Sequence, residues 1–283
     1  MTFQNLGIMQ GRLSQPIERR IQHFPIENWE EEFRVIANLD LSSIEWVYEH
    51  NKVEKNPLHA FENLDRIKKI SKDANVCISS VVADYFMESK LFNEDDSLIK
   101  ENLGILKTLV MNSEYVGIPI IELPFVDNSS LKDCSDIKGF VKRLSSIVEI
   151  ASDLGIKISL ETDLEPRSFK SLLRMFLPLK VYANFDMGNS AANGFNPKEE
   201  IQILSEDIIN VHIKDRVLGG GTVPLGEGDT DFYEVFSQLE SINYSEDFIL
   251  QAARQDIGRN NYKNCVSTIT EYIEFLKPYI IER

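Results

Sequence analysis

The chain has 283 residues, of which 43% are hydrophobic, and its 45 acidic and 30 basic residues give a formal net charge of −15. This composition is typical of a soluble globular protein, and the negative charge repels phosphate backbones, which argues against nucleic acid as a partner. The apolar runs are too short to cross a membrane, and the amino terminus lacks the basic start and long apolar core of a signal peptide, so no membrane partner and a cytoplasmic location are expected.

The spacing of the cysteines and the absence of a linker sequence also indicate how the chain is organised. Cys77, Cys134 and Cys265 have no C-x-x-C spacing, and their odd number argues against a closed disulfide framework, so buried free thiols are expected. No Pro, Gly or Ser tract marks a linker. Because single α/β barrels commonly reach about 250 residues, residues 1–283 are expected to form a single domain.

Short apolar runs alternate with amphipathic helical patterns, which predicts a parallel sheet built from strand and helix units. The predicted strands are Leu6–Met9, Ser43–Trp46, Val76–Val82, Gly117–Leu123, Lys157–Glu161, Val181–Asp186, Ile208–Asp215 and Phe248–Gln251. The predicted helices are Trp29–Leu39, Leu58–Lys72, Asp96–Tyr115, Ile137–Leu154, Ser168–Phe176, Pro197–Leu204, Phe232–Leu239 and Asn260–Leu276. Eight strands and eight helices indicate a closed (β/α)8 TIM barrel, with the long loops after strands one, three and seven on the catalytic face.

Local signals mark several helix ends. Asn28 is the expected N-cap of the first helix, and Gly117 closes the helix before the fourth strand. Thr230 or Asp229 is expected to cap the helix that begins at Phe232.

Four predicted strands end near side chains that can bind a metal. Glu161, Asp186 and His212 stand near the carboxyl ends of the fifth, sixth and seventh strands, and Gln251 ends the eighth. Parallel strands open their carboxyl ends on one face, so these side chains are expected to converge. Carboxylate, imidazole and amide ligands suit Mn²⁺, Mg²⁺, Co²⁺ or Zn²⁺, and one divalent ion, with Mn²⁺ preferred, is the predicted cofactor.

The same segments carry a resemblance to a known family. They read Ser-Leu-Glu at 159–161, Phe-Asp-Met-Gly-Asn at 185–189, Val-His-Ile-Lys-Asp at 211–215 and Leu-Gly-Glu-Gly-Asp-Thr-Asp-Phe at 225–232. This set resembles the xylose-isomerase-like barrel superfamily, and within it the sugar phosphate isomerase/epimerase group, which includes L-ribulose-5-phosphate 3-epimerase and the ketose 3-epimerases. The resemblance implies a metal held by Glu161, Asp186 and His212.

The eighth strand departs from the family's pattern. The resemblance implies a second glutamate there, and this chain has Gln251. In the family the two glutamates serve as base and acid on opposite faces of the sugar. An amide keeps an oxygen for a metal but does not exchange protons. Two reactions therefore stay open: epimerisation with another carboxylate, such as Glu122 or Glu45, and aldose to ketose isomerisation by one base.

Basic side chains near the strand ends are candidates for binding an anionic substrate. Strand alternation places Lys214 on the same side as His212, and Arg216 follows at the mouth of the barrel. Arg254 and Arg12 are further candidates for this role.

Other residues have two interpretations. The glycines at 219–221 and 226–228 either form turns or let backbone N–H groups approach an anion. The aromatic side chains either form the wall of a sugar pocket or pack in the core, and these are Trp46, Tyr85 and Phe86. The remaining histidines are expected to be solvated, and these are His23, His50 and His59.

The predicted function is a metal-dependent sugar or sugar phosphate isomerase or epimerase, in which Glu161 moves the proton α to the carbonyl. Gln251 supports one alternative, a sugar-binding relative without activity. Another alternative keeps the metal and changes the reaction, as in a keto-inositol dehydratase or a hydroxypyruvate isomerase.

A DNA abasic-site endonuclease is disfavoured, because that class needs a cluster rich in His and this chain has four His, one of them at a strand end. The predicted partner is a small-molecule sugar or sugar phosphate, and a homo-oligomer is one of the states that the sequence allows.

Overall fold

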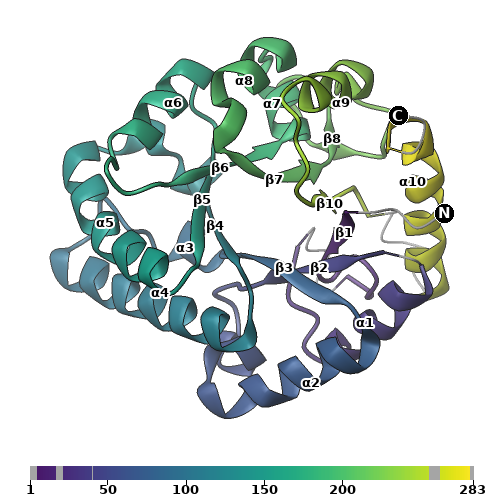
Figure 1. Ribbon diagram of the computed structural model, residues 1–283, viewed down its shortest axis with the longest axis horizontal. Coiled ribbons are helices and arrows are strands. Elements are labelled where there is room, and N and C mark those ends of the chain that lie inside the picture. Colours follow the sequence, from purple (N-terminus) through teal and green to yellow (C-terminus); the bar gives the residue numbers. More distant parts are fainter. Residues whose placement is uncertain (1–4, 17–21, 40, 255–261, 281–283) are drawn as a thin grey trace.

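The computed structural model describes residues 5–16, 22–39, 41–254 and 262–280, and in these ranges eight parallel strands close into a barrel with the order β1-β10-β7-β6-β5-β4-β3-β2 (Figure 1). The strands of the barrel are β1 Leu6–Met9, β2 Ser43–Val47, β3 Cys77–Val82, β4 Ile120–Phe125, β5 Lys157–Thr162, β6 Tyr182–Asp186, β7 Ile208–Ile213 and β10 Phe248–Leu250. A short antiparallel ribbon joins β8 Asp215–Arg216 to β9 Thr222–Val223 outside the barrel. The predicted (β/α)8 fold is confirmed.

Helices surround the barrel in Figure 1, and most begin within a few residues of the predicted position. They are α1 Trp29–Asn38, α2 Leu64–Ala74, α3 Tyr85–Glu88, α4 Asp96–Val116, α5 Ile137–Asp153, α6 Pro166–Arg174, α7 Met187–Asn193, α8 Pro197–Leu204, α9 Phe232–Ser241 and α10 Tyr262–Ile280. The predicted start of the last helix at Asn260 lies outside the described residues.

Several predicted helix ends need correction. The second helix begins at Leu64 rather than Leu58, because the Asn56 side chain accepts the Leu58 N–H and holds this stretch in 3-10 turns. Helix α9 is capped by Asp231, whose carboxylate accepts the Glu234 N–H, and not by Thr230 or Asp229. Asn28 occupies the N-cap position of α1 without a side-chain hydrogen bond. Gly117 ends α4 at φ 93°, as predicted.

The inside of the barrel is polar. Side chains alternate along a strand, so in β5, β6 and β7 every second residue points to the barrel axis. Contacts across the barrel identify the inward residues, since His212 of β7 meets Glu45 of β2 and Glu122 of β4. TIM barrels usually fill this space with branched apolar side chains. In this protein charged and amide side chains from β2, β4, β6 and β7 contact one another inside the barrel. Polar groups that could take part in a functional site therefore lie inside the barrel as well as at its mouth.

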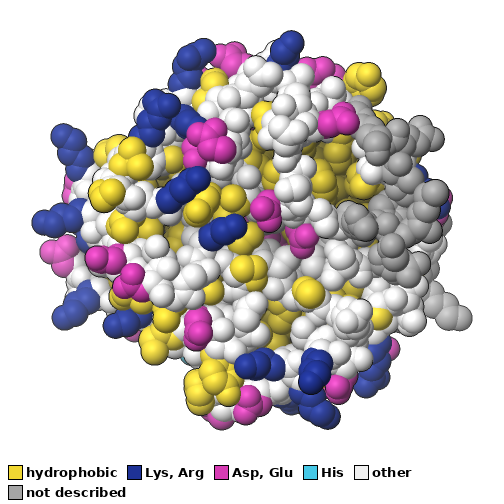
Figure 2. Space-filling view, viewed as in Figure 1, with side chains coloured by type: hydrophobic (Ala, Val, Ile, Leu, Met, Phe, Trp, Pro, Cys, Tyr) yellow, Lys and Arg dark blue, Asp and Glu magenta, His cyan; other side chains and the backbone are white. Residues whose placement is uncertain are grey.

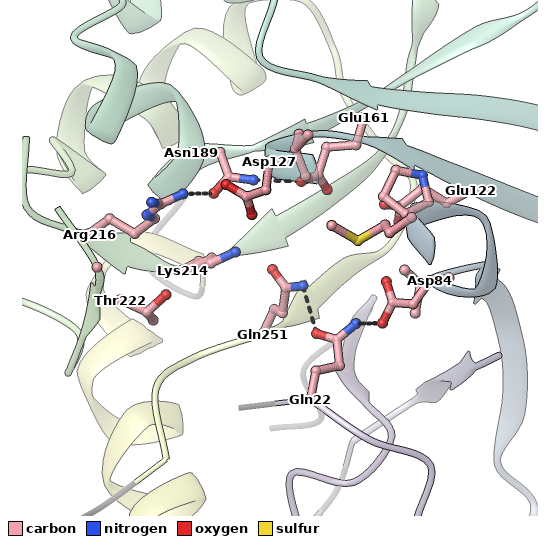
Figure 3. A pocket seen from close by; sticks show the side chains of 15 residues that line it. Gln22, Asp84, Glu122, Asp127, Glu161, Asn189, Lys214, Arg216, Thr222 and Gln251 are labelled. Atoms are coloured by element: carbon pink, nitrogen blue, oxygen red, sulfur yellow. Dashed lines mark hydrogen bonds between the residues drawn. The ribbon is translucent and has the colours of Figure 1, made fainter. Parts of the chain in front are cut away.

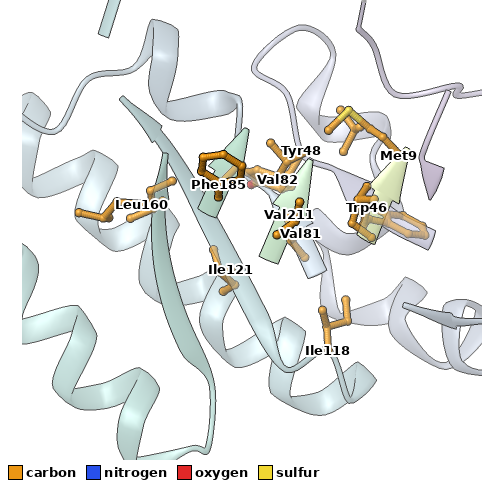
Figure 4. Packing of buried hydrophobic residues seen from close by; sticks show 14 of the residues in the cluster. Met9, Trp46, Tyr48, Val81, Val82, Ile118, Ile121, Leu160, Phe185 and Val211 are labelled. Atoms are coloured by element: carbon orange, nitrogen blue, oxygen red, sulfur yellow. The ribbon is translucent and has the colours of Figure 1, made fainter. Parts of the chain in front are cut away.

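The apolar residues between those polar positions face the helices instead. Leu160, Phe185 and Val211 are each at most 1% exposed and belong to the layer between the barrel and its helices, part of which Figure 4 shows. Trp46 and Phe86 are fully buried in the same layer, and Trp46 packs against aromatic neighbours. Of their two interpretations, core packing is the correct one.

The surface carries charged side chains of both signs. In Figure 2 basic and acidic side chains are interspersed around the edge of the described part of this face. Within the described ranges, no helix combines the length and apolarity needed to span a bilayer. The three cysteines are unpaired, as predicted, but Cys77 is exposed at the start of β3, so the expectation that all three are buried is wrong.

Candidate active site

The carboxyl ends of β5, β6 and β7 bring together the predicted metal ligands. These strands are neighbours in the barrel, with Asp186 beside His212 in the register. The His212 Nδ1 atom lies 3.3 Å from Glu161 Oε2 and 4.0 Å from Asp186 Oδ2. One ligand atom from each residue lies within 4.8 Å of the others, a spacing that suits a single cation.

The other nitrogen of His212 faces a second pair of carboxylates deeper in the barrel. Its Nε2 atom lies 3.0 Å from Glu45 Oε2 and 3.1 Å from Glu122 Oε2, and all three side chains are fully buried. Glu45 also accepts hydrogen bonds from the hydroxyl of Ser80 and the amide of Asn210. These are ion-pair distances, so the inner pair faces Nε2 directly.

The inner pair favours a proton on Nε2, because two carboxylates lie closest to that nitrogen. When the ring is neutral, its Nδ1 lone pair then points to Glu161 and Asp186. A histidine that binds a metal through one nitrogen usually donates the other N–H to a carboxylate, and the inner pair is placed for that role.

Buried charges shift the protonation of the whole group. Burial on its own raises the pKa of Glu161, but the hydrogen bond and charge of His212, together with Lys214, bring that pKa down to about 2. Burial lowers the pKa of His212, yet the charges of Glu45 and Glu122 outweigh it and hold this pKa well above its ordinary value. Burial raises the pKa of Glu122 well above the usual range. Glu161 is thus ionised at neutral pH.

A cavity of about 280 Å³ opens over Glu161 at the mouth of the barrel (Figure 3). Both Lys214 and Arg216 line it, as predicted. Lys214 donates to Asp186 Oδ2 at 3.0 Å. The residues that line the cavity are Gln22, Val82, Asp84, Met87, Glu122, Pro124, Val126, Asp127, Glu161, Asn189, Lys214, Arg216, Gly221, Thr222 and Gln251.

Asparagines that the sequence analysis did not identify hold the carboxylate of Glu161. Asn184 Nδ2 donates to Glu161 Oε2 at 2.8 Å, and Asn189 Nδ2 donates to the other oxygen. The side-chain Oδ1 atom of Asn189 accepts from Arg216 Nη1 at 2.6 Å. Arg216 is thereby connected to the carboxylate through a single amide.

Residues 33–273 match the family model described as "Xylose isomerase-like TIM barrel". The chain belongs to this family.

Similar sequences include a named sugar phosphate epimerase and an uncharacterized protein. The L-ribulose-5-phosphate 3-epimerase UlaE of Shigella flexneri is 23% identical over 80% of this chain and 82% of its own length. An uncharacterized protein of Methanocaldococcus jannaschii is 30% identical, but the match spans half of each chain. The predicted resemblance to the sugar phosphate isomerase/epimerase group is confirmed.

Solved structures share the fold. A structure of L-ribulose 3-epimerase has a TM-score of 0.78 at 15% identity and covers 99% of this chain and 95% of its own. A structure of IOLI protein with a bound zinc atom has a TM-score of 0.75 at 16% identity and covers 98% of this chain and 99% of its own. The second shows that a protein of this fold binds a divalent metal.

Gln251 follows the last residue of β10 and lines the cavity. Its Nε2 donates to Gln22 Oε1 at 3.2 Å, whereas its buried Oε1 has no hydrogen-bond partner among the described residues. A buried amide oxygen without a partner costs free energy unless a ligand satisfies it. With two carboxylates and an imidazole nitrogen nearby, this donor set fits a divalent cation of the kind predicted.

The remaining basic candidates do not line the cavity. Arg12 is 3% exposed and donates to the carbonyl of Ala252 at 3.1 Å, and burial together with Arg254 lowers its pKa to about 9. Arg254 donates to the carbonyl of Ser14 at 3.1 Å. These contacts connect the loop after β1 to the end of β10, and a direct role of either arginine in substrate binding stays a prediction.

Two further expectations change on inspection. His23 is 2% exposed and contacts Arg254 through Nδ1 at 3.3 Å, so it is not a solvated side chain. The N–H groups of Gly226 and Gly228 donate to Asp215 Oδ2 at 2.8 and 2.9 Å, so this turn serves the fold rather than an anion. Gly221, from the other glycine run, does line the cavity.

Proposed function

We propose that the chain is a metal-dependent isomerase or epimerase of a small sugar or sugar phosphate, acting by proton transfer α to the carbonyl. The observation that carries the proposal is the pair of contacts on His212, because the inner carboxylates take Nε2 and leave Nδ1 for the group formed with Glu161 and Asp186. The names of the relatives support the same class of reaction.

The metal would be held by Glu161, Asp186 and His212, with Gln251 as the fourth ligand. When bound, a divalent cation supplies positive charge beside the carbonyl and hydroxyl oxygens of an open-chain sugar, which favours charge on oxygen. Mn²⁺ is the preferred ion, because oxygen ligands outnumber nitrogen in this set.

Glu161 removes the proton from the carbon next to the carbonyl. Its carboxylate is ionised and is held in place by the amides of Asn184 and Asn189, so it faces the substrate in one orientation. Lys214 and Arg216 line the same cavity and donate to the hydroxyl groups or the phosphate of the sugar. The cavity volume of about 280 Å³ suits a molecule of this size.

The experiment is deuterium incorporation from D₂O into a panel of sugars: D-psicose, D-fructose, D-tagatose, L-ribulose and L-ribulose 5-phosphate. Protein loaded with Mn²⁺ should exchange the proton α to the carbonyl of at least one of them, and Glu161→Gln should lower that rate on the order of 10²–10⁴-fold. Glu149→Gln, an exposed change on α5, is the matched control and should keep the wild-type rate.

Two results would contradict the proposal. Exchange by Glu161→Gln at the wild-type rate excludes Glu161 as the base. Binding of a sugar without exchange by the wild type identifies a sugar-binding relative, the alternative that Gln251 favours because an amide does not act as an acid or a base at neutral pH.

A further inference from the structure

Asp84 is a carboxylic acid that lines the cavity and has no part in the mechanism above. It follows β3 by two residues, and its side chain is partly buried. The amide of Gln22 donates a hydrogen bond to Asp84 Oδ2. Gln22 in turn accepts from Gln251 Nε2 at 3.2 Å and from Arg12 Nη2 at 3.4 Å. Asp84 is therefore held in place by a row of side chains from three separate loops.

This row lies across the cavity from Glu161. In the strand order three strands separate β5 from β1 on either side, so the loop after β1, which carries Gln22, stands opposite the strand that carries Glu161. Asp84 follows β3, which only β4 separates from β5, and it turns toward Gln22. In Figure 3 Glu161 lies at the top of the view and Gln251, Gln22 and Asp84 lie below it, so the two carboxyl groups reach the cavity from different strand ends.

The other acidic residues that line the cavity are less suited to proton transfer from that side. Glu122 Oε2 lies 3.1 Å from His212 Nε2, so it is engaged in holding the imidazole. Asp127 is exposed on the 3-10 turn Asp127–Ser129. Among the described residues that line the cavity, Asp84 is the remaining carboxyl group besides Glu161.

Asp84 is suited to give up a proton at neutral pH. Burial raises the pKa of Asp84 to about 7, and the charges of Glu161 and Glu45 act in the same direction against the hydrogen bond from Gln22. A carboxyl group near its midpoint at neutral pH can both donate a proton and take one back.

We propose that Asp84 is the second proton-transfer residue, so that the chain inverts the carbon α to the carbonyl. The proposal rests on the function proposed above. Glu161 takes the proton from one face, the C–H electron pair enters an enediolate, and Asp84 donates its proton to the same carbon from the opposite face. The carbonyl then forms again, Asp84 takes a proton from solvent, and Glu161 releases one.

The assignment also explains why an amide is sufficient at position 251. Gln251 and Gln22 keep Asp84 in position through neutral hydrogen bonds and leave the exchangeable proton on the acid. The sequence suggested Glu122 or Glu45 in place of the glutamate missing from β10, whereas the acid proposed from the structure follows β3.

The test separates the two proton transfers with the isosteric change Asp84→Asn. The probe is the sugar of the panel that the wild type exchanges fastest, incubated with Mn²⁺-loaded protein in D₂O. Formation of the epimer should fall on the order of 10²–10⁴-fold, because the second face loses its proton donor. Deuterium should still enter the recovered substrate at close to the wild-type rate through Glu161. Asp73→Asn, an exposed change on α2, is the control and should alter neither rate.

Retained exchange also shows that the variant folds and binds metal. Epimer formation by Asp84→Asn at the wild-type rate would overturn the proposal, as would loss of both rates in a variant with wild-type metal content and melting temperature. A wild type that only interconverts aldose and ketose needs no second face, and that result also excludes this role for Asp84. If the wild type exchanges no sugar, the proposed function fails, and the role of Asp84 fails with it.

Discussion

The two nitrogens of His212 face two pairs of carboxylates that differ in their distance from the ring. On the inner side Glu45 and Glu122 lie 3.0 and 3.1 Å from Nε2, and every side chain there is fully buried. On the outer side Glu161 and Asp186 lie 3.3 and 4.0 Å from Nδ1, at the strand ends. The same three kinds of ligand atom thus occur twice around one ring. Composition of a cluster does not by itself locate a metal site, and the distances from the ring distinguish the two sides.

Removing the ring itself should have the largest effect. His212→Ala deletes the shared ligand and should abolish stoichiometric Mn²⁺ binding, measured by calorimetry and metal analysis. It also leaves Glu45 and Glu122 without their cation, and breaking a buried pair in this way costs about 3–5 kcal/mol of unfolding free energy. Urea unfolding of the metal-free protein at pH 7 measures that loss.

An exposed histidine provides the control for this change. His50→Ala should keep both metal content and unfolding free energy, since the ring is exposed beyond β2. If His212→Ala binds Mn²⁺ as the wild type does, the metal site lies elsewhere.

A smaller effect is expected when the inner pair is altered and the ring is kept. Glu45→Gln removes a negative charge that orients Nε2–H, and loss of such an outer partner weakens metal binding about 10–100-fold. The control is Glu62→Gln on the surface, measured by the same titration. Loss of binding as complete as in His212→Ala would make the inner pair a ligand set of its own, and an unchanged Kd would show that it does not position the ring.

The smallest effect is a change in proton release. The pKa of His212 is raised by the inner carboxylates, so the ring is protonated below that pKa and a proton must leave Nδ1 before a metal binds. Metal affinity should therefore fall as pH is lowered. At pH 7 the wild type should release about one proton per metal, measured by calorimetry in buffers of different ionisation enthalpy. Glu45→Gln lowers the pKa of His212 and should release fewer. Equal release by both proteins would disprove this link.

The fold was predictable because its signals are local. Each strand is a short apolar run, and each run is followed by an amphipathic helix, which is sufficient to count eight units. The predicted start of a helix was wrong where a hydrogen bond from one side chain sets the local backbone conformation. Asn56 delays the start of α2 by accepting the Leu58 N–H, and no periodic pattern contains that information.

The outer side of the site was predictable for the same reason, since Glu161, Asp186 and His212 stand at strand ends. The partners of these residues were harder to identify. Asn184 and Asn210 lie between apolar residues within the buried strands β6 and β7. This alternation indicates that they point into the barrel, whereas the sequence analysis treated both segments as continuous apolar runs. Gln22 lies in the loop after β1 and meets Asp84 only through the closure of the barrel. Such contacts depend on three-dimensional proximity alone.

The buried carboxylate of Asp215 has a consequence for engineering. Its two oxygens accept the N–H groups of Gly226, Gly228 and Thr230, so both ends of the intervening segment are fixed to one side chain. The exposed tip at 217–220 lies between those ends and borders Arg216, which donates to the carbonyl of Gly220. Loops of other lengths can therefore be grafted at the tip while the base keeps its shape. Libraries confined to this tip would alter the substrate range and leave the barrel frame intact.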